Sequence, residues 1–328
     1  MNRYDVAVVG GSVAGLQAAV TLARARLRVV LFDDDRARNR TAPHVHNYLG
    51  VEDPSPAELL AVGRRQATAY GVEVTTARVG DITVDDGSVD DGRVDDGLVD
   101  DGLVDDGLVD GGVDDGFVVG TVDGRRVRAR TVVLATGLRD ELPDVPGVAE
   151  AWGRLVVACP HCHGWEVSDQ PLVQLGLRGL PDRSVTRALL LSRWSNDVVL
   201  CTDGDELTDD HLSRLGKAGV TVRSEKVEAV QPQQADVRVV LKGGEALLPR
   251  AVFVVVRQHQ QCELAARLGC RLVDGAVAVD ESGRTTVPGV YAVGTTAVPS
   301  LFAIGAAGHA STTAVALHAD LLERDLSS

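Results

Sequence analysis

Tyr4-Asp5-Val6-Ala7-Val8-Val9-Gly10-Gly11-Ser12-Val13-Ala14-Gly15 is the stretch that decides the fold. Its first six residues predict a short apolar strand, the glycines predict a tight turn, and the amphipathic pattern that continues to about Arg26 predicts a helix. Such a turn presents free backbone N–H groups and the positive end of a helix dipole to the pyrophosphate of a dinucleotide. Ser12 stands where glycine usually allows the closest backbone approach to the phosphates, and serine is small enough to fit there.

Three further segments predict strands that end at residues typical of a dinucleotide site. Residues 28–32 predict a second strand that ends at Asp33-Asp34-Asp35, where a carboxylate can accept hydrogen bonds from an adenosine ribose. Residues 131–137 predict a buried strand ending in Ala135-Thr136-Gly137, and residues 287–294 predict another strand ending in Gly294, before a helix of small residues from about residue 302. The sequence therefore predicts an α/β protein that binds a dinucleotide such as FAD.

Between these segments lies Cys159-Pro160-His161-Cys162-His163-Gly164. Two thiols one helical turn apart can reach each other, and neighbouring histidines can stabilise a thiolate, so the pair can cycle between dithiol and disulfide. We interpret it as the reaction centre. The other cysteines, Cys201, Cys262 and Cys270, lie in apolar or helical surroundings and are expected to be inert.

The same cysteines allow two other interpretations. Residues 159–163 also spell the attachment motif of c-type haem, which requires export and a haem pocket. Two cysteines also supply half of a zinc site, but no second pair of ligands stands at a suitable spacing. We therefore predict a redox pair and no metal.

Composition indicates the class of protein. The chain has 328 residues, of which 45% are apolar, and this length favours two domains. The first residues lead directly into an apolar strand without a leader, and no apolar run is long enough to span a bilayer. We expect a cytoplasmic enzyme with no membrane partner.

The net charge of −14 comes mostly from one acidic repeat. Residues 84–118 repeat Val-Asp-Asp-Gly-X and hold 13 Asp and one Arg, which leaves 32 basic and 34 acidic residues elsewhere. The repeat lacks the longer glycine-aspartate periods that wrap calcium, so we interpret it as an expanded, solvated hairpin connection. No basic stripe appears elsewhere, which argues against nucleic acid.

Taken together, these motifs resemble the thioredoxin-reductase-like FAD-dependent disulfide oxidoreductases. The resemblance covers nearly the whole chain, including Arg38-Asn39-Arg40 with His44 and His46. It is closest to the gliotoxin- and holomycin-type dithiol oxidase branch, which carries a Cys-Pro-X-Cys-His-Gly motif. From the residues alone, we expect His44 and His46, two apart on one strand face, to line the flavin pocket or cap a turn.

This resemblance implies two Rossmann-like, three-layer nucleotide-binding domains, the second inserted in the first. Residues 1–147 and 259–328 would form the FAD domain, with the acidic repeat of residues 84–118 as an insertion. Residues 148–258 would form a middle domain that resembles an NAD(P) domain and carries the cysteines. The resemblance also implies a homodimer.

FAD is the cofactor that the resemblance implies, and it assigns a set of residues to it. Those residues are Gly10, Gly11, Ser12, Ala14 and Gly15 at the pyrophosphate, Asp33 and Asp34 at the ribose, Val79 at the adenine, Ala135, Thr136, Gly137, Gly294 and Thr295 along the cofactor, and Phe302 and Ala303 at the isoalloxazine. The family has Asp where this chain has Thr295, which can still make one hydrogen bond.

The middle domain contains a second strand, helix and strand. They are predicted at residues 171–175, 184–194 and 197–201. The turn between the first two, Gly176-Leu177-Arg178-Gly179-Leu180-Pro181, lacks the three-glycine spacing, and Leu177 and Pro181 crowd the phosphate position. The loop Thr202-Asp203-Gly204-Asp205-Glu206 is acidic where an NADP 2′-phosphate needs arginine. We predict that the NADPH site is lost; NADH stays open, because Asp203 can serve an NAD ribose.

The resulting prediction is an FAD-dependent dithiol oxidase that uses O2 and releases H2O2. A substrate thiolate would attack Cys159, a second thiol would release the product disulfide, and Cys162 would be the flavin-facing sulfur by resemblance. His163 would act as general acid and base. Trp165 and Glu166 are expected to be packing and strand-edge residues.

Several alternatives stay open on the sequence alone. One is an NAD(P)H-dependent thioredoxin-disulfide reductase. Another is a cofactor-less binding module of the same fold, which Ser12 and Thr295 would fit. The substrate can be a small dithiol, a peptide or a thioredoxin-like protein, and His161 is expected to be a surface or hydrogen-bonded residue.

Overall fold

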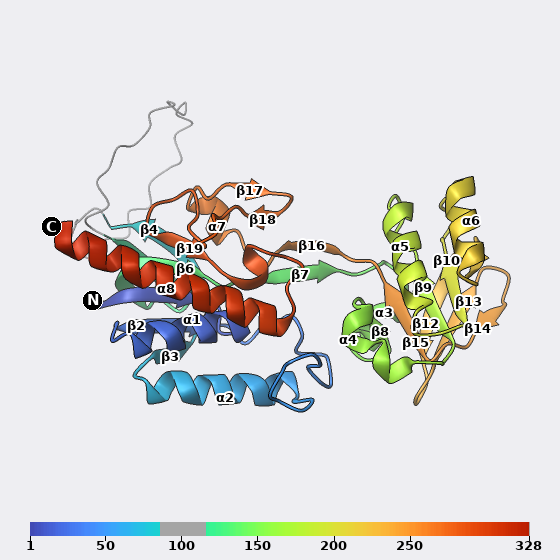
Figure 1. Ribbon diagram of the computed structural model, residues 1–328, viewed down its shortest axis with the longest axis horizontal. Helices are drawn as coiled ribbons and strands as arrows, with labels where there is room; N and C mark the ends of the chain where they lie inside the picture. The colour runs from blue at the N-terminus through green and yellow to red at the C-terminus, as the bar shows by residue number, and fades with distance from the viewer. Residues whose placement is uncertain (86–115, 328) are drawn as a thin grey trace, which may run out of the picture.

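The protein is described by a computed structural model that covers residues 1–85 and 116–327. The described chain forms two units that lie end to end and are joined by a narrow ribbon (Figure 1). In this ribbon β7 (Leu138–Glu141) pairs antiparallel with β16 (Arg257–Gln260). We call the part before β7 and after β16 the terminal unit, and the part between them the middle unit. The predicted fold, two Rossmann-like domains with the second inserted in the first, is confirmed, whereas the predicted boundaries at 147/148 and 258/259 stay predictions.

The terminal unit is built on a seven-stranded sheet in the order β3-β2-β1-β6-β5-β4, with β19 beside β6. The strands are β1 (Asn2–Val9), β2 (Val29–Asp33), β3 (Glu73–Thr76), β4 (Val79–Val84), β5 (Phe117–Thr121), β6 (Arg126–Leu134) and β19 (Val290–Ala292). β1 runs parallel to β2 and β6, and its near-continuous apolar run fits a strand buried on both faces. β6 pairs with β5 along its first half and with β19 along its second half, so the last part of the chain completes the sheet.

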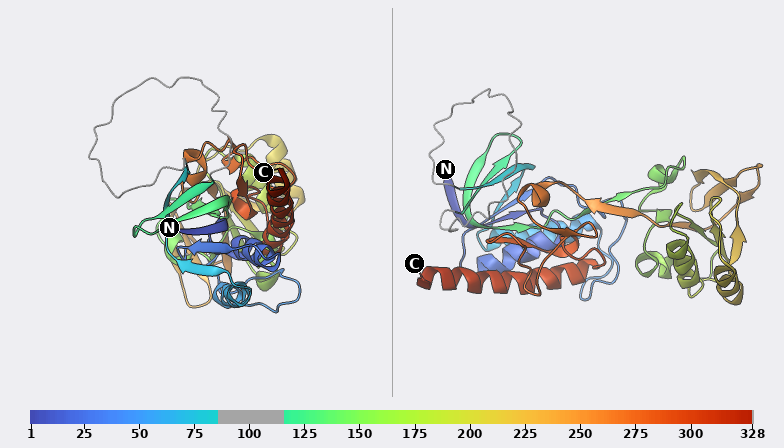
Figure 2. Two further views of the ribbon diagram at one scale, coloured as in Figure 1. Left: turned by 90° about the vertical axis from the view of Figure 1, so that its left-hand side faces the viewer. Right: turned by 90° about the horizontal axis from the view of Figure 1, so that it is seen from above.

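Helices cover one face of this sheet (Figure 2). They are α1 (Val13–Arg24), α2 (Pro56–Ala69) and α8 (Ala303–Ser327). Alanines such as Ala18, Ala310 and Ala314 let α1 and α8 approach closely in one apolar cluster. The second apolar cluster, on the other side, includes residues of α7 (Leu264–Arg267) and β18 (Ala276–Val277), which pairs with β17 (Leu272–Val273).

The middle unit holds a parallel sheet in the order β11-β10-β9-β15-β8. Its strands are β8 (Val156–Val157), β9 (Leu172–Leu175), β10 (Val198–Cys201), β11 (Thr221–Arg223) and β15 (Ala251–Val254). Two apolar clusters flank the sheet. One cluster contains residues of α5 (Pro181–Leu191) and α6 (Asp209–Lys217). The other contains residues of α3 (Val148–Ala151), β12 (Val227–Pro232), β13 (Val237–Leu241) and β14 (Ala246–Leu247). The cysteine segment follows β8 as α4 (Pro160–His163) and the 3-10 turn η1 (Trp165–Val167).

Some predicted bounds were wrong. α5 begins at Pro181 and ends at Leu191, not at residues 184 and 194, because proline is favoured at the first helical position and Asp182 suits the first turn. His44 and His46 lie in the irregular loop between β2 and α2, not on a strand. Most of the acidic repeat, residues 86–115, lies outside the described residues; β4 and β5, which flank it, pair antiparallel. Within residues 1–85 and 116–327, no helix is both long and apolar enough to cross a membrane.

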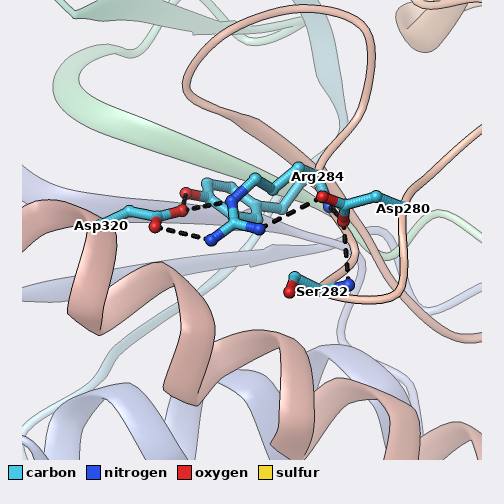
Figure 3. A network of polar contacts seen from close by, with 5 residues as sticks. Asp280, Ser282, Arg284 and Asp320 are labelled. Carbon is cyan, nitrogen blue, oxygen red and sulfur yellow. Dashed lines mark hydrogen bonds and ion pairs between the residues drawn. The ribbon is translucent and has the colours of Figure 1, made fainter.

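An arginine ties the turn after β18 to α8 (Figure 3). Arg284 donates from Nε and Nη2 to the two carboxylate oxygens of Asp320, both at 2.7 Å, and from Nη1 to Asp280 at 3.2 Å. Tyr291 donates its hydroxyl proton to Asp320 at 2.5 Å. The Arg284 hydrogen bonds are the main cause that lowers the pKa of Asp320, so this carboxylate is charged at neutral pH.

Arg284→Gln is expected to lower the free energy of unfolding by about 1–2 kcal/mol at pH 7, because it removes a bidentate charged contact. The carboxylate's contribution is complete above the unfolded aspartate pKa of about 3.9 and is lost as pH falls through the lowered folded value. Urea denaturation at pH 7 and pH 3 measures both effects. Arg267→Gln, which breaks the exposed pair with Glu263 at 2.9 Å, is the control and should cost at most about 0.5 kcal/mol. An equal loss for both variants would contradict the assignment.

Candidate active site

A cavity of about 300 Å³ lies where the two units meet. Residues from distant parts of the sequence line it. The predicted site residues that line it are Gly10, Gly11, Ser12, Ala14, Asp33, Asp34, Ala135, Thr136, Gly137, Cys159, Cys162, His163, Thr295, Phe302 and Ala303. Val79 instead lines a smaller neighbouring cavity, which shares Gly10 and Asp34 with the first. Gly15 and Gly294 line neither cavity.

The glycines around the first turn are required by close packing. Gly10 has a φ of +108°, and a Cβ there would stand 2.3 Å from the carbonyl oxygen of Ala135. A Cβ on Gly15 would stand 1.8 Å from the carbonyl oxygen of Gly10, and one on Gly294 would stand 2.6 Å from the Cβ of Ala14. Gly15 and Gly294 therefore allow the close packing behind the cavity, although neither residue lines it.

Helix N-termini open on this cavity from two sides. Ser12 is the N-cap of α1, and its side chain makes no capping hydrogen bond, so N–H groups of the first turn stay available to a ligand. Ala303 and Ala306 of α8 line the cavity at a second N-terminus, next to Phe302, whose side chain is 42% exposed. A pyrophosphate at α1 and a flavin ring that becomes anionic on reduction at α8 both match these dipoles. The residues present thus fit FAD.

Asp33 and Asp34 differ in their partners. Asp33 is 8% exposed and accepts hydrogen bonds from Arg64 at 2.5 Å and from the N–H of Asp35 at 3.2 Å. Within residues 1–85 and 116–327, the side chain of Asp34 makes only a long ion pair with Arg36, at 3.7 Å, and it lines both cavities. Of the two predicted ribose acceptors, Asp34 is therefore the one with fewer contacts to other protein groups.

Two threonines, Thr295 and Thr296, follow Gly294 in the turn after β19. Thr295 lines the cavity, and the hydroxyl of Thr296 accepts a hydrogen bond from the N–H of Gly137 at 2.7 Å. The N–H of Gly294 donates to Nδ1 of His309 at 3.2 Å. Burial lowers the pKa of His309, which keeps this nitrogen free to accept. The Thr296 hydroxyl therefore joins the segment after β6 to the turn after β19, and His309 joins that turn to α8.

The two cysteines occupy unequal positions. Cys159 is the N-cap of α4 and Cys162 lies one turn later, its N–H donating to the carbonyl of Cys159 at 3.2 Å. Both are free thiols. A hydrogen bond from the Cys162 thiol lowers the pKa of Cys159 to about 7, with backbone N–H groups and the Arg187 guanidinium adding to the effect. The same hydrogen bond, together with burial, raises the pKa of Cys162. The thiolate of the reduced pair therefore resides on Cys159.

His163 follows this pair at the end of α4, and both of its ring nitrogens are buried. Burial lowers the pKa of its ring, while the backbone of Cys159 and the Glu166 carboxylate act in the opposite direction. His161 points elsewhere: its ring is 5.4 Å from the Trp194 ring and 6.3 Å from the Phe302 ring, measured between centroids. Asn47 donates to the His161 carbonyl at 2.7 Å. His161 is thus a hydrogen-bonded residue at the contact between the units.

Two expectations for the following residues were wrong. Trp165 is 82% exposed and does not pack in the interior. The Trp194 ring packs against Gly164, where an added Cβ would stand 2.9 Å from the ring. The Trp165 side chain, one residue later, is turned outward. Glu166 lies in η1 and not at a strand edge, and its carboxylate is 3.5 Å from Nε2 of His46.

Arg187 was missed by the sequence analysis. It lies on α5, half-buried, and the charge interactions that favour its cation come from Cys159 and Cys162. The available signal was its place beside the apolar stripe of α5, formed by Val185, Ala188 and Leu191. In residues 1–85 and 116–327, no group of three or more histidine, cysteine, aspartate or glutamate side chains is arranged to hold a metal ion.

The turn of the middle unit is occupied by the protein's own carboxylates. The N–H of Gly179 donates to Asp205 at 2.9 Å. Arg178 pairs with Asp203 at 3.3 Å, and Asp203 also accepts from the N–H of Val227 at 3.0 Å. These acids stand beside the loop that, in a dinucleotide-binding unit, would face phosphates.

Comparisons with known proteins agree with this geometry. The family model described as pyridine nucleotide-disulphide oxidoreductase matches residues 4–317. The probable thioredoxin reductase of Arthroderma benhamiae is 28% identical over 98% of this chain and 81% of its own length, and thioredoxin reductase tcpT of Claviceps purpurea is 30% identical over 66% of this chain and 61% of its own.

Solved structures extend the likeness to the fold. The crystal structure of HlmI has a TM-score of 0.86 at 39% identity and is matched over 98% of this chain and 94% of that one. An oxidoreductase from Agrobacterium tumefaciens has a TM-score of 0.84 at 29% identity, over 98% of this chain and 99% of that one. This chain therefore belongs to the pyridine nucleotide-disulphide oxidoreductase family and is a thioredoxin-reductase-like oxidoreductase.

Proposed function

We propose that this protein is an FAD-dependent dithiol oxidase, which converts a small dithiol to its disulfide and passes the electrons to O2, giving H2O2. One observation carries the proposal. The cysteine pair lines the same cavity as the glycine turn and the N-terminus of α8, while the turn of the middle unit binds its own Asp205 and Asp203. This arrangement would give electrons a route from a dithiol, and the carboxylates at the turn support the proposed loss of the NADPH site.

The unequal thiols support a two-step exchange. A substrate thiolate attacks Sγ of Cys159 in the oxidised pair, the Cys159–Cys162 bond breaks, and Cys162 leaves as a thiolate. The second substrate thiolate then attacks the substrate sulfur of the mixed disulfide, and Cys159 leaves. Its pKa of about 7 makes Cys159 a good leaving group in this second step.

His163 takes the protons that the substrate thiols lose. Burial keeps its ring neutral, which is the state that accepts a proton. The cofactor would be held by the N-terminus of α1, Asp34, the Ala135-Thr136-Gly137 turn, Thr295 and the N-terminus of α8. When bound, FAD supplies the two-electron acceptor that dioxygen can reoxidise.

An NAD(P)H-dependent thioredoxin-disulfide reductase is the second candidate. The names of the relatives favour it, since several are called thioredoxin reductases. An NAD ribose would need Asp203, whose carboxylate already bonds Val227 and Arg178. A cofactor-less binding module is the third candidate; a purified protein that is colourless and takes up no FAD would establish it.

Partners follow from the same proposal. The substrate would be a small dithiol or, as an alternative, a thioredoxin-like protein, and the compartment would be the cytoplasm. A homodimer is supported by the outward face of α8, where Ile304, Val315 and Leu322 are exposed.

The direction of electron flow can be measured. Under argon, dithiothreitol is expected to bleach the flavin absorbance and admitted air to restore it with release of H2O2, while NADPH and NADH leave it unchanged for minutes. Asp205→Asn is the informative variant, because it removes a charge beside the turn without touching the cysteines. Bleaching of the wild-type flavin by NADPH within seconds would overturn the oxidase assignment in favour of the reductase.

A further inference from the structure

A half-buried arginine of the middle unit, Arg187, has no part in the reaction as described so far. It lies on α5, three residues after Ser184 and four before Leu191, and both of these are buried. Residues at these spacings share one side of a helix, so Arg187 belongs to the buried side of α5. Arg183, one turn earlier, is exposed.

The cysteine segment packs along the same helix. Val157, just before the segment, belongs to the apolar cluster that contains the buried side of α5, and Val167, just after it, packs against that cluster. Between them, α4 contacts α5, and Gly164 packs against the Trp194 ring, which follows the C-terminus of α5. The segment is therefore held against the helix that carries Arg187.

No carboxylate in residues 1–85 and 116–327 forms an ion pair with Arg187, and the charges that favour its cation belong to the thiolates of Cys159 and Cys162. Arg38 acts on Cys162 from the loop after β2, but it already donates two hydrogen bonds to Asp140, at 2.7 and 2.6 Å. The charge of Arg38 is thus shared with an acid, whereas that of Arg187 is open to the thiolate.

Several elements bring titratable or charged groups to the cysteine pair. The hydrogen bond from Cys162 has the largest effect in lowering the pKa of Cys159, and the charge of Arg187 acts in the same direction. The groups around the pair are His161 and His163 of α4, Arg187 of α5, and Arg38 and His46 of the loop after β2. Among these, Arg187 combines a permanent charge with the lack of an acidic partner.

The oxidised pair offers this cation no anion. Arg187 stays protonated in both states of the pair, because a guanidinium does not lose its proton near neutral pH. A half-buried cation is stabilised by a neighbouring anion, and the reduced pair supplies one on Cys159. A group that stabilises the reduced form of a cysteine pair makes the corresponding disulfide a stronger oxidant.

We propose that Arg187 stabilises the Cys159 thiolate of the reduced pair and thereby makes the Cys159–Cys162 disulfide a stronger oxidant of the substrate dithiol. The inference rests on the proposed function, since it assigns a further residue to the same exchange. Two electrons pass from the substrate sulfurs to the pair: the Cys159–Cys162 bond breaks and the substrate S–S bond forms. Cys159 ends as a thiolate, Cys162 ends with one substrate proton, and the other proton is released.

The first test measures the Cys159 thiolate in the holoenzyme, reduced with a phosphine under argon. Iodoacetamide alkylation of Cys159, followed by peptide mass spectrometry, should have its midpoint about one pH unit higher in Arg187→Gln than in wild type, and a rate about tenfold lower at pH 6. Arg187→Lys keeps the charge and should stay within about 0.3 pH units of wild type. Arg183→Gln, the matched control on the exposed side of α5, should do the same.

The second test measures the strength of the disulfide as an oxidant. In anaerobic mixtures of reduced and oxidised glutathione at pH 8, with acid quenching and alkylation of free thiols, the equilibrium of Arg187→Gln should favour the disulfide about fivefold more than that of wild type. The reason is that less of its reduced pair is a thiolate at this pH.

Three results would each overturn the inference: an unshifted alkylation midpoint in Arg187→Gln, an equal shift in Arg183→Gln or Arg187→Lys, or an unchanged glutathione equilibrium. A wild-type flavin that dithiols do not reduce contradicts the proposed function instead. The alkylation and glutathione measurements still decide the role of Arg187 in that case, because neither of them follows the flavin.

Discussion

Cys159→Ser and Cys162→Ser are each expected to lower dithiol-dependent oxygen consumption by at least roughly 1000-fold, because each removes one of the two sulfurs that exchange with substrate. Cys162→Ser keeps the sulfur that is attacked in the oxidised wild type, and Cys159→Ser keeps the other sulfur, whose pKa is raised in the wild type mainly by Cys159 itself. An oxygen electrode with dithiothreitol measures the loss.

The reduced wild type offers a direct check on this inequality. Alkylation of Cys159 by iodoacetamide requires the thiolate, so its rate should rise with pH through a midpoint near the pKa of about 7, while Cys162 stays unreactive. Cys270→Ser, which changes a cysteine in the core of the terminal unit, is the control and should leave activity unchanged. Full activity in either Cys159→Ser or Cys162→Ser would remove the basis of the proposed reaction.

Gly10→Ala is expected to abolish flavin retention. The added Cβ would stand 2.3 Å from the Ala135 carbonyl at a φ of +108°, so either the turn or the end of β6 has to move. Both of these line the cavity, and a displacement of either spoils the phosphate cradle. The ratio of flavin absorbance to protein absorbance after purification in excess FAD measures the effect.

The control isolates the close contact from the backbone conformation. Gly71 also has a positive φ, +86°, but a Cβ there meets nothing within 4 Å. Gly71→Ala should therefore cost about 1 kcal/mol of stability and keep its flavin. If Gly10→Ala and Gly71→Ala retain flavin equally, the turn around Gly10 is not the cofactor cradle.

Much of the site could be predicted because short motifs carry their own geometry. The strand, glycine turn and helix at Gly10 and the Ala135-Thr136-Gly137 strand end are local patterns, and parallel pairing of β1 with β6 brings them together. The cysteine pair was found for the same reason, since one helical turn fixes its spacing. These residues line one cavity although more than one hundred residues separate Gly10 from the other two motifs in the sequence.

Other features depended on contacts that no local pattern encodes. The outward turn of Trp165 follows from Trp194, which occupies the space beneath Gly164. The pairing of His46 with Asp53 and Glu166 joins an irregular loop to the middle unit, and neither periodicity nor spacing predicts an irregular loop. Long-range packing set these positions, and it is visible only in the folded chain.

The division of the cavity between the two ends of the chain bears on how the cofactor is acquired. Gly10 to Ala14 leave the ribosome before the opposing wall, from Val293 to Ala306, which follows only after the residues between them have been synthesised. A nascent chain can thus expose the phosphate turn without enclosing a flavin ring. We therefore expect a flavin to be enclosed only after this second wall has been synthesised.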